Sequence, residues 1–250
     1  MELIGNTVLI TGGGSGIGAG LAKAFHALGN TVIVAGRRRE PLEMLAKALP
    51  GIKLIELDIN EPASIAKASS ALANEYPSLN VLINNAGIML ADDAANRIDD
   101  ATAVAQITTN LLGPIRLTSA LMPLLRRQPR AHIVYNTSSV GFTPMALFAV
   151  YSATKAALHS YILSQRFLLK DSRVTVQELV PPWVGTGLFG PADHPLAMAL
   201  DKFIDGTMAA LATEELEILV DEARPQRDNA GPNEHTYVDQ LNTFLLGQSY

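Results

Sequence analysis

The sequence contains no cysteine, and only one of its 250 residues is tryptophan. A chain without cysteine has no disulfide framework and offers no thiolate ligand to a metal. Long hydrophobic runs are also missing. Because no stretch of about eighteen uninterrupted apolar residues occurs, we expect no membrane-spanning helix. The lack of cysteine suits a reducing compartment, and we expect a cytoplasmic protein by default.

Positive charge is scarce as well. Nineteen Lys and Arg residues stand against 24 Asp and Glu residues, which gives a net charge of −5 at pH 7. Affinity for nucleic acid depends largely on Lys and Arg, so no nucleic-acid partner is expected. Residues 1–6 carry an acid at Glu2 and lead directly into an apolar run, which is not the pattern of a secretory signal.

What the sequence does contain is a regular alternation of short apolar runs and helical patterns. The runs predict strands at 7–11, 31–35, 53–57, 81–84, 132–136 and 174–179. The segments between them predict helices at 17–28, 41–49, 62–76, 101–125 and 151–169. Strands that are nearly all apolar are typical of a parallel sheet covered on both faces. The alternation therefore predicts an α/β fold with a mostly parallel sheet flanked by helices on both faces.

The pattern changes after residue 180. Four prolines lie within residues 181–195, at positions 181, 182, 191 and 195. Two further helices are predicted at 195–211 and 213–223. Towards the end, the spacing of Tyr237, Leu241, Phe244 and Leu245 is typical of one face of a short helix. No linker or repeat occurs before residue 180, so we predict a single domain over residues 1–250.

A glycine-rich turn follows the first predicted strand and precedes the first predicted helix, in the order Thr11, Gly12, Gly13, Gly14, Ser15, Gly16, Ile17, Gly18. Backbone N–H groups at a helix N-terminus bind a phosphate closely only where side chains do not intervene. A tight structural turn would have a similar sequence. The position at the first strand–helix junction favours a dinucleotide pyrophosphate.

Arginines occupy the end of the second strand. An acid at this place would accept hydrogen bonds from the adenosine ribose 2′-OH, but here Arg37, Arg38 and Arg39 come first and Glu40 only afterwards. A guanidinium offers a forked set of donors to a 2′-phosphate. The sequence therefore favours NADP(H). The alternative is that the arginines are a solvated helix start and that NAD(H) is accepted or preferred.

Tyr151 and Lys155 lie four residues apart at the start of a helical pattern. This spacing places the phenol and the ammonium on one helix face, with Cβ atoms roughly 5–6 Å apart. A cation at that distance is expected to lower the pKa of tyrosine from about 10 towards the range of acid–base catalysis. Such a pair is common by chance, and an exposed helix pair is the alternative. Ser138, at the end of the fifth predicted strand, makes the catalytic interpretation stronger.

The spelling T-G-x-x-x-G-x-G, the Y-x-x-x-K pair and a serine thirteen residues before the tyrosine resemble the short-chain dehydrogenase/reductase family over residues 3–187. The resemblance implies a doubly wound Rossmann-type sheet and an NAD(P)-dependent oxidoreductase of the carbonyl reductase or alcohol dehydrogenase type. It also implies a catalytic tetrad of Asn110, Ser138, Tyr151 and Lys155. Ser139 is the alternative to Ser138 as the catalytic serine. The family places this serine three residues before a glycine, and the spacing to Gly141 favours Ser138.

The resemblance divides the chain into a cofactor half at 1–110, a catalytic half at 111–186, a substrate lid at 187–224 and a tail at 225–250. Pro182 stands where the family usually has glycine, which stiffens the turn and removes a backbone donor. The implied cofactor contacts are Gly12, Gly14, Ser15, Gly16, Ile17, Gly18, Arg37, Arg38, Asp58, Ile59, Asn85, Ala86, Gly87, Tyr151, Lys155, Pro181, Val184 and Thr186.

Apolar residues near the tetrad and in the lid indicate the kind of substrate. We expect ketones or aldehydes with an apolar substituent, although ordinary packing would explain each residue singly. His194 is expected at the surface, and no metal-ligand pattern accompanies it. The residues expected to line the substrate pocket are Ser138, Val140, Phe142, Met145, Tyr151 and Phe189.

The resemblance weakens in the last third of the chain. The family's common seventh-strand signature, V-D-G-G, is missing, so the edge strand is either absent or unrecognisable. The segments 5–10, 80–85 and 181–184 resemble a bacterial subgroup associated with the D-alanylation of lipoteichoic acid. Family analogy implies a homotetramer or a homodimer. The alternative functions are an epimerase or dehydratase that uses bound NAD, and a non-catalytic dinucleotide-binding regulator.

Overall fold

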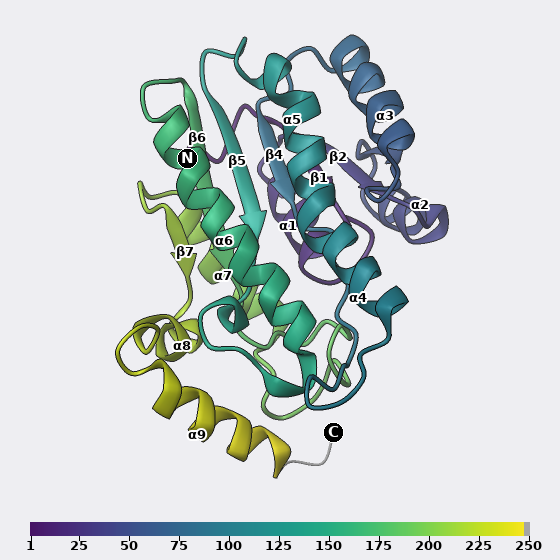
Figure 1. The fold of residues 1–250 in the computed structure, drawn as a ribbon. Coiled ribbons are helices and arrows are strands. Elements are labelled where there is room, and N and C mark those ends of the chain that lie inside the picture. Colours follow the sequence, from purple (N-terminus) through teal and green to yellow (C-terminus); the bar gives the residue numbers. More distant parts are fainter. Residues whose placement is uncertain (248–250) are drawn as a thin grey trace.

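The protein forms one seven-stranded parallel sheet in a computed structural model that describes residues 1–247 (Figure 1). The strand order is β3-β2-β1-β4-β5-β6-β7. The strands are β1 (Thr7–Thr11), β2 (Thr31–Gly36), β3 (Lys53–Glu56), β4 (Val81–Asn84), β5 (Ala131–Asn136), β6 (Val174–Val180) and β7 (Glu217–Leu219). All six predicted strands are present. The order reverses between β1 and β4, and α/β proteins bind ligands at the carboxyl ends of the strands beside such a reversal.

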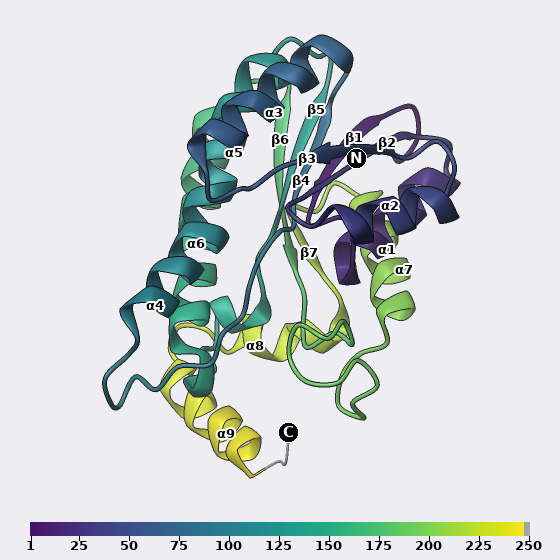
Figure 2. The ribbon, with the colours of Figure 1, turned by 90° about the vertical axis from the view of Figure 1, so that its right-hand side faces the viewer.

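Helices cover both faces of the sheet, as predicted (Figure 2). One layer contains α1 (Gly16–Ala27), α2 (Arg39–Ala48) and α7 (Leu200–Leu211). The other layer contains α3 (Pro62–Glu75), α4 (Asp100–Ile107), α5 (Gly113–Leu125) and α6 (Ala149–Leu169). The doubly wound α/β prediction is confirmed.

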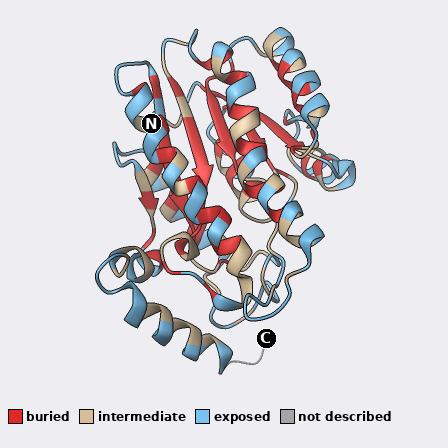
Figure 3. Ribbon diagram, in the orientation of Figure 1, coloured by how far each residue is buried: buried red, intermediate tan, exposed pale blue. Residues whose placement is uncertain are grey.

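The hydrophobic core has two halves, one on each side of the sheet, and the central strands are buried almost throughout, whereas the edge strand β3 has no buried residue (Figure 3). Because successive side chains of a strand point to opposite faces, Val8 and Ile10 belong to one half while Leu9 belongs to the other. Phe25 of α1 and Phe203 of α7 fill the first half and are fully buried. This two-sided burial explains why the strand sequences are continuous apolar runs.

The region after residue 211 differs from the sequence prediction. The helix predicted at 213–223 was wrong: β7 lies there, followed by a 3₁₀ turn at Asp221–Ala223. Ile218 is buried, and β7 pairs with the full-length strand β6 through Glu178↔Glu217 and Val180↔Leu219. Edge pairing and burial outweigh the local helical pattern, so the sheet has a seventh strand without the usual signature. Two helices follow, α8 (Arg224–Asp228) and α9 (Glu234–Leu246).

Two other helices differ from the prediction, one in where it starts and the other in its continuity. The helix predicted from 195 starts at Leu200, and the one predicted over 101–125 is interrupted by a π-helical turn at Thr108–Leu112 between α4 and α5. The helix indicated by the spacing of the tail residues is present as α9, which has no buried residue (Figure 3). Within residues 1–247 no helix has both the length and the apolar character to cross a membrane.

Three buried asparagines join the amino ends of β1, β2 and β4, at the edge of the sheet opposite the carboxyl ends. The Asn80 side-chain oxygen accepts from Thr7 N at 2.9 Å, and its Nδ2 donates to Asn6 Oδ1 at 2.9 Å. Asn6 N donates to Asn30 Oδ1, also at 2.9 Å. Since buried backbone groups need partners, these amides fix the register at which the strands start.

We expect Asn80→Ala to lower the free energy of unfolding by about 2–3 kcal/mol, because it leaves the Thr7 N–H and the Asn6 amide without their buried partner. Equilibrium urea unfolding measures this difference. Asn96→Ala is the control: Asn96 is exposed, and its replacement should change stability by less than about 0.5 kcal/mol. Equal effects of the two substitutions would contradict a special role for Asn80.

Candidate active site

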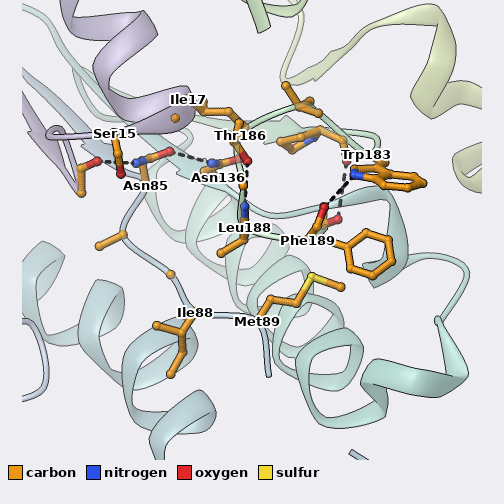
Figure 4. A pocket seen from close by; sticks show the side chains of 18 of the residues that line it. Ser15, Ile17, Asn85, Ile88, Met89, Asn136, Trp183, Thr186, Leu188 and Phe189 are labelled. Atoms are coloured by element: carbon orange, nitrogen blue, oxygen red, sulfur yellow. Dashed lines mark hydrogen bonds between the residues drawn. The ribbon is translucent and has the colours of Figure 1, made fainter. Parts of the chain in front are cut away.

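A cavity of about 1320 Å³ opens at the carboxyl ends of the central strands (Figure 4). Its walls come from the turn after β1, the ends of β2, β4, β5 and β6, and the lid segment that precedes α7. The side chains of Ser15 and Asn85 lie at one end of the close-up and Trp183 and Phe189 at the other, with Thr186 between them (Figure 4). The cavity thus spans the region where sequence analysis placed both the cofactor and the substrate.

The glycine turn presents bare backbone to the cavity. Gly12 and Gly16 have φ values of +65° and +52°, a conformation that L side chains rarely adopt. Ser15, the N-cap of α1, makes no side-chain cap hydrogen bond, so the first amides of this helix are available to an anion. Gly12, Gly14, Ser15, Gly16 and Ile17 line the cavity.

Gly18 has a different task, since it does not line the cavity. A Cβ at this position would lie 2.5 Å from Asn85 Nδ2 and would also collide with the Gly12 carbonyl oxygen. Only glycine therefore lets α1 approach the ends of β1 and β4 this closely.

Hydrogen bonds tie the loop after β4 to the end of β1. The Thr11 hydroxyl accepts from Asn85 N and Ala86 N, both at 3.0 Å. Asn85 Nδ2 donates to Thr11 O at 2.9 Å, and Asn85 Oδ1 accepts from Asn136 Nδ2 at 2.8 Å (Figure 4). This chain of bonds holds Ala86 and Gly87 in the cavity wall.

The three arginines after β2 do not share one environment. Arg37 and Arg38 line the cavity. Arg39 does not line it and instead forms an exposed ion pair with Glu43 at 2.5 Å. Two arginines therefore lie at the end of the cavity where the resemblance places the adenosine ribose.

Of the two residues after β3 that the resemblance assigns to the cofactor, only one lines the cavity. Ile59 lines the cavity, as the resemblance implies, whereas Asp58 does not. The Asp58 carboxylate accepts from Asn60 N at 2.9 Å, and Asp58 N donates to Ser64 Oγ at 3.0 Å. Asp58 thus closes the turn before α3.

Ser138, Tyr151 and Lys155 meet in the cavity wall, and all three are buried. Burial raises the pKa of Tyr151 to about 12, and the nearby Ser138 hydroxyl opposes part of that rise. We expected Lys155 to bring this pKa down towards neutrality, and in the polypeptide itself that expectation is wrong. Removal of the phenolate from water is the largest cause, and it outweighs the hydrogen bond with Ser138. Tyr151 consequently carries its proton at neutral pH, in the form that can donate to a carbonyl oxygen.

Lys155 lies beside Tyr151 as the four-residue spacing predicts. Its Nζ is 5.4 Å from the centroid of the Tyr151 ring and donates to Asn136 O at 2.8 Å. Burial lowers the pKa of Lys155 to about 8, and the negative charge of Glu178 opposes this effect. The ammonium is therefore a buried cation that loses its proton as the pH rises through about 8.

Asn110 lies in the π-helical turn between α4 and α5 and does not line the cavity. Its side chain accepts from Ile88 N at 2.9 Å and donates to Ile88 O at 2.8 Å. A Cβ at Gly87 would be 3.2 Å from Asn110 Oδ1 and 3.8 Å from Lys155 Nζ, so the two side chains are close neighbours. Asn110 fixes the loop after β4 against the catalytic helix.

The segment after β6 closes the cavity opposite the glycine turn. Pro181, Pro182, Val184 and Thr186 all line it. A Cβ at Gly16 would lie 3.1 Å from Thr186 Cβ, so the two segments face each other directly. The segment is anchored to the lid because Met198 N donates to Trp183 O, and Gly185 N donates to Met198 O, both at 2.9 Å.

The far end of the cavity is apolar and aromatic. Val140, Met145 and Phe189 line it, but Phe142 does not. The Phe142 ring instead contacts His159, at 4.7 Å between centroids, and lies 4.8 Å from the Arg227 guanidinium. It therefore faces the sheet edge and not the substrate pocket.

Sequence analysis did not assign several of the lining residues. Trp183 packs on Phe189 at 4.7 Å and stacks on His194 at 4.3 Å between ring centroids, so His194 of the lid contacts a residue that lines the cavity. The only signal for Leu241, Phe244 and Leu245 of α9 was their helical spacing, and these three residues line the cavity as well. Asn242 Nδ2 attaches α9 to the body by donating to Pro144 O at 2.9 Å.

Comparison with known proteins identifies the class. The short chain dehydrogenase family model matches residues 6–196. Oxidoreductase DltE of Bacillus subtilis (strain 168), described as uncharacterized, is 35% identical over 97% of this chain and 99% of its own length. The chain therefore belongs to the short-chain dehydrogenase/reductase family and is an oxidoreductase of that family.

One further relative supports this assignment, and a solved structure shares the fold. The NADP-dependent 3-hydroxy acid dehydrogenase YdfG of Salmonella typhimurium is 34% identical over 71% of this chain and 72% of its own length. A crystal structure of a short chain dehydrogenase from Burkholderia cenocepacia in complex with NADP has the same fold, with a TM-score of 0.85. That structure is 24% identical in sequence and covers 96% of this chain and 99% of its own.

The close approach at Gly18 leads to a prediction. Alanine in a helix is normally more stable than glycine by about 1 kcal/mol, but Gly18→Ala should destabilise the protein by about 1–3 kcal/mol because the Cβ meets backbone. Urea unfolding decides the sign. Gly36→Ala is the control, since a Cβ there meets only Leu42, at 3.7 Å. A stabilising effect of Gly18→Ala would show that α1 does not need this contact.

Proposed function

We propose that the protein is an NADP(H)-preferring carbonyl reductase that acts on ketones or aldehydes with an apolar substituent. The observation that carries the proposal is Tyr151, a buried and protonated phenol between Ser138 and the Lys155 ammonium, at the junction of a bare glycine turn and an apolar pocket. Asn110, Ser138, Tyr151 and Lys155 act as the catalytic tetrad.

The residues of the wall fit a nicotinamide dinucleotide. The uncapped amides of α1 suit its pyrophosphate, and Thr186 lies opposite them. When bound, the nicotinamide supplies hydride to a carbonyl carbon or takes it from an alcohol. We assign the cofactor contacts to those residues implied by the family resemblance that also line the cavity, while Gly18, Asp58 and Asn110 lie behind that wall.

The chain's own groups act on the substrate oxygen. The Ser138 and Tyr151 hydroxyls donate hydrogen bonds to the carbonyl oxygen, where negative charge develops. Tyr151 then transfers its phenolic proton to that oxygen, and the Lys155 ammonium stabilises the phenolate that remains. Burial of both side chains strengthens this interaction, because little water competes for the charge.

The preference for NADP(H) rests on Arg37 and Arg38, which line the adenosine end of the cavity without a competing acid. A relative, YdfG, is itself described as NADP-dependent. The preference for an apolar substituent rests on the opposite end, where Val140, Met145 and Phe189 line the wall.

We also propose that the chain is one domain and that it assembles into a homodimer or homotetramer in the cytoplasm. Large apolar side chains are exposed along α4, the π-helical turn and α6, on one side of the sheet. An exposed apolar surface of this kind is typical of an interface between subunits. Its residues are Val104, Ile107, Leu112, Leu163, Phe167 and Leu168.

Tyr151→Phe tests the assignment of the proton donor. We expect kcat for NADPH-dependent reduction of an aryl ketone to fall about 10²–10⁴-fold, because a general acid is lost, while NADPH binding stays nearly unchanged. Tyr161→Phe, the same substitution on the same helix, serves as the control. Tyr161 is only partly buried and does not line the cavity. A near-normal kcat for Tyr151→Phe would refute the role, and tight NADPH binding without turnover in the wild type would favour a non-catalytic regulator.

Arg38→Ala and Arg37→Ala test the cofactor preference. Each removes a charge-assisted donor to the 2′-phosphate, so kcat/KM for NADPH should fall about 10–100-fold while kcat/KM for NADH changes little. Arg39→Ala is the matched control because Arg39 pairs with Glu43 outside the cavity. A wild-type enzyme that prefers NADH, or equal losses with both cofactors, would contradict the proposal.

A further inference from the structure

Glu178 is an unusual residue for its position. It lies in β6, in the interior of the sheet, and its relative exposure is 0%. Acidic side chains are almost never fully buried unless they are paired, because removal of the charge from water is costly. The family resemblance gives this carboxylate no role, and it does not line the cavity.

The two oxygens of Glu178 are bound to neighbours of the catalytic residues. Thr137 Oγ1 donates to Oε1 at 2.8 Å, and Thr137 immediately precedes Ser138. His159 Nδ1 donates to Oε2 at 2.7 Å, and His159 follows Lys155 by one turn of α6. Glu178 therefore joins the end of β5 to the catalytic helix from behind the site.

Several other charged groups surround the carboxylate, from each element packed against it. A second carboxylate, Glu217, is already engaged by Arg227, with contacts of 2.7 and 3.2 Å. Glu178 is the acid whose negative charge acts on Lys155, where it opposes the lowering of the lysine pKa by burial. The surrounding titratable or charged groups are Lys155, His159 and Arg166 on α6, Glu217 on β7 and Arg227 on α8.

We propose that Glu178 is a positioning residue of the reductase site, which binds Thr137, the neighbour of Ser138, to His159 on the helix that carries Lys155. This inference rests on the proposed function for its effect on catalysis. Its effect on the lysine charge is a property of the polypeptide alone.

Glu178→Gln removes the charge and keeps the shape. The glutamine oxygen can still accept from Thr137, and its amide can donate to His159 once the imidazole changes tautomer. Without the carboxylate, the effect of burial on Lys155 is opposed less, so the pKa of Lys155 falls. Because a lysine loses its cation as the pH rises through its pKa, the variant should lose the Lys155 charge at a lower pH than the wild type does.

The first experiment measures this pKa directly. The rate at which acetic anhydride labels the Lys155 amine is followed by peptide mass spectrometry from pH 6 to 10. In the wild type we expect the labelling midpoint near the Lys155 pKa of about 8. In Glu178→Gln we expect the midpoint about one pH unit lower. Glu217→Gln, the same change on the next strand, should leave the midpoint and the activity unchanged. An unshifted midpoint in folded Glu178→Gln would overturn the counter-charge.

The second experiment measures catalysis. In Glu178→Gln the alkaline limb of kcat/KM for ketone reduction should move down by the same amount as the labelling midpoint, with activity near pH 6 affected least. Thr137→Val should lower kcat about tenfold without moving the labelling midpoint, because it frees Ser138 but leaves the charge in place. An unchanged kcat in Thr137→Val would overturn the positioning through Thr137.

The two readouts separate this inference from the proposed function. A shifted labelling midpoint in a protein that reduces no carbonyl would refute the reductase and retain the link between Glu178 and Lys155. Normal carbonyl reduction with identical pH profiles in the wild type and Glu178→Gln would retain the reductase and refute the link between Glu178 and Lys155. If Glu178→Gln does not reach the native circular dichroism spectrum, Glu178→Met, which suits an apolar strand, takes its place in both experiments.

Discussion

The site depends on the burial of a cation. Lys155 is 4% exposed, and an ammonium in such a place is stable only when nearby groups replace the water that it has lost. Asn136 O accepts one of its protons at 2.8 Å, and the charge of Glu178 acts on it from β6. The strand ends therefore supply what solvent would otherwise give, and their arrangement is constrained by this requirement.

The same burial determines which form of Tyr151 is present. Removal from water disfavours the phenolate and the ammonium alike, so the tyrosine pKa rises to about 12 while the lysine pKa falls to about 8. At neutral pH the pair is a neutral phenol beside a cation. A neutral phenol is a proton donor, which suits reduction of a carbonyl, and the oxidation of an alcohol would need the proton removed first. Burial, and not the spacing of the two residues, therefore decides the protonation state of Tyr151 in the resting site.

Much of the fold could be predicted because its signals are local. Continuous apolar runs identified six strands, and the glycines of the first turn identified the junction at Gly12 and Gly16, where the backbone adopts positive φ. The seventh strand was missed because three residues contain too little pattern, and their pairing with β6 depends on tertiary contacts. The π-helical turn around Asn110 likewise follows from its bonds to Ile88, which lies 22 residues away.

The candidate site shows the same limit. Ser138, Tyr151 and Lys155 were found because their spacing is fixed along the chain, and the structure brings them together. The pKa of Tyr151 was misjudged because spacing gives the distance to a cation but not the loss of water. Glu178 escaped notice for a related reason: in sequence it is one of three polar residues of its strand, with Thr175 and Gln177, and the only acid among them. Its bonds to Thr137 and His159 span 41 and 19 residues. An isolated acid in a buried parallel strand is nevertheless a signal in itself, because the fold must supply partners for it, and here both partners are neighbours of the residues that carry the chemistry.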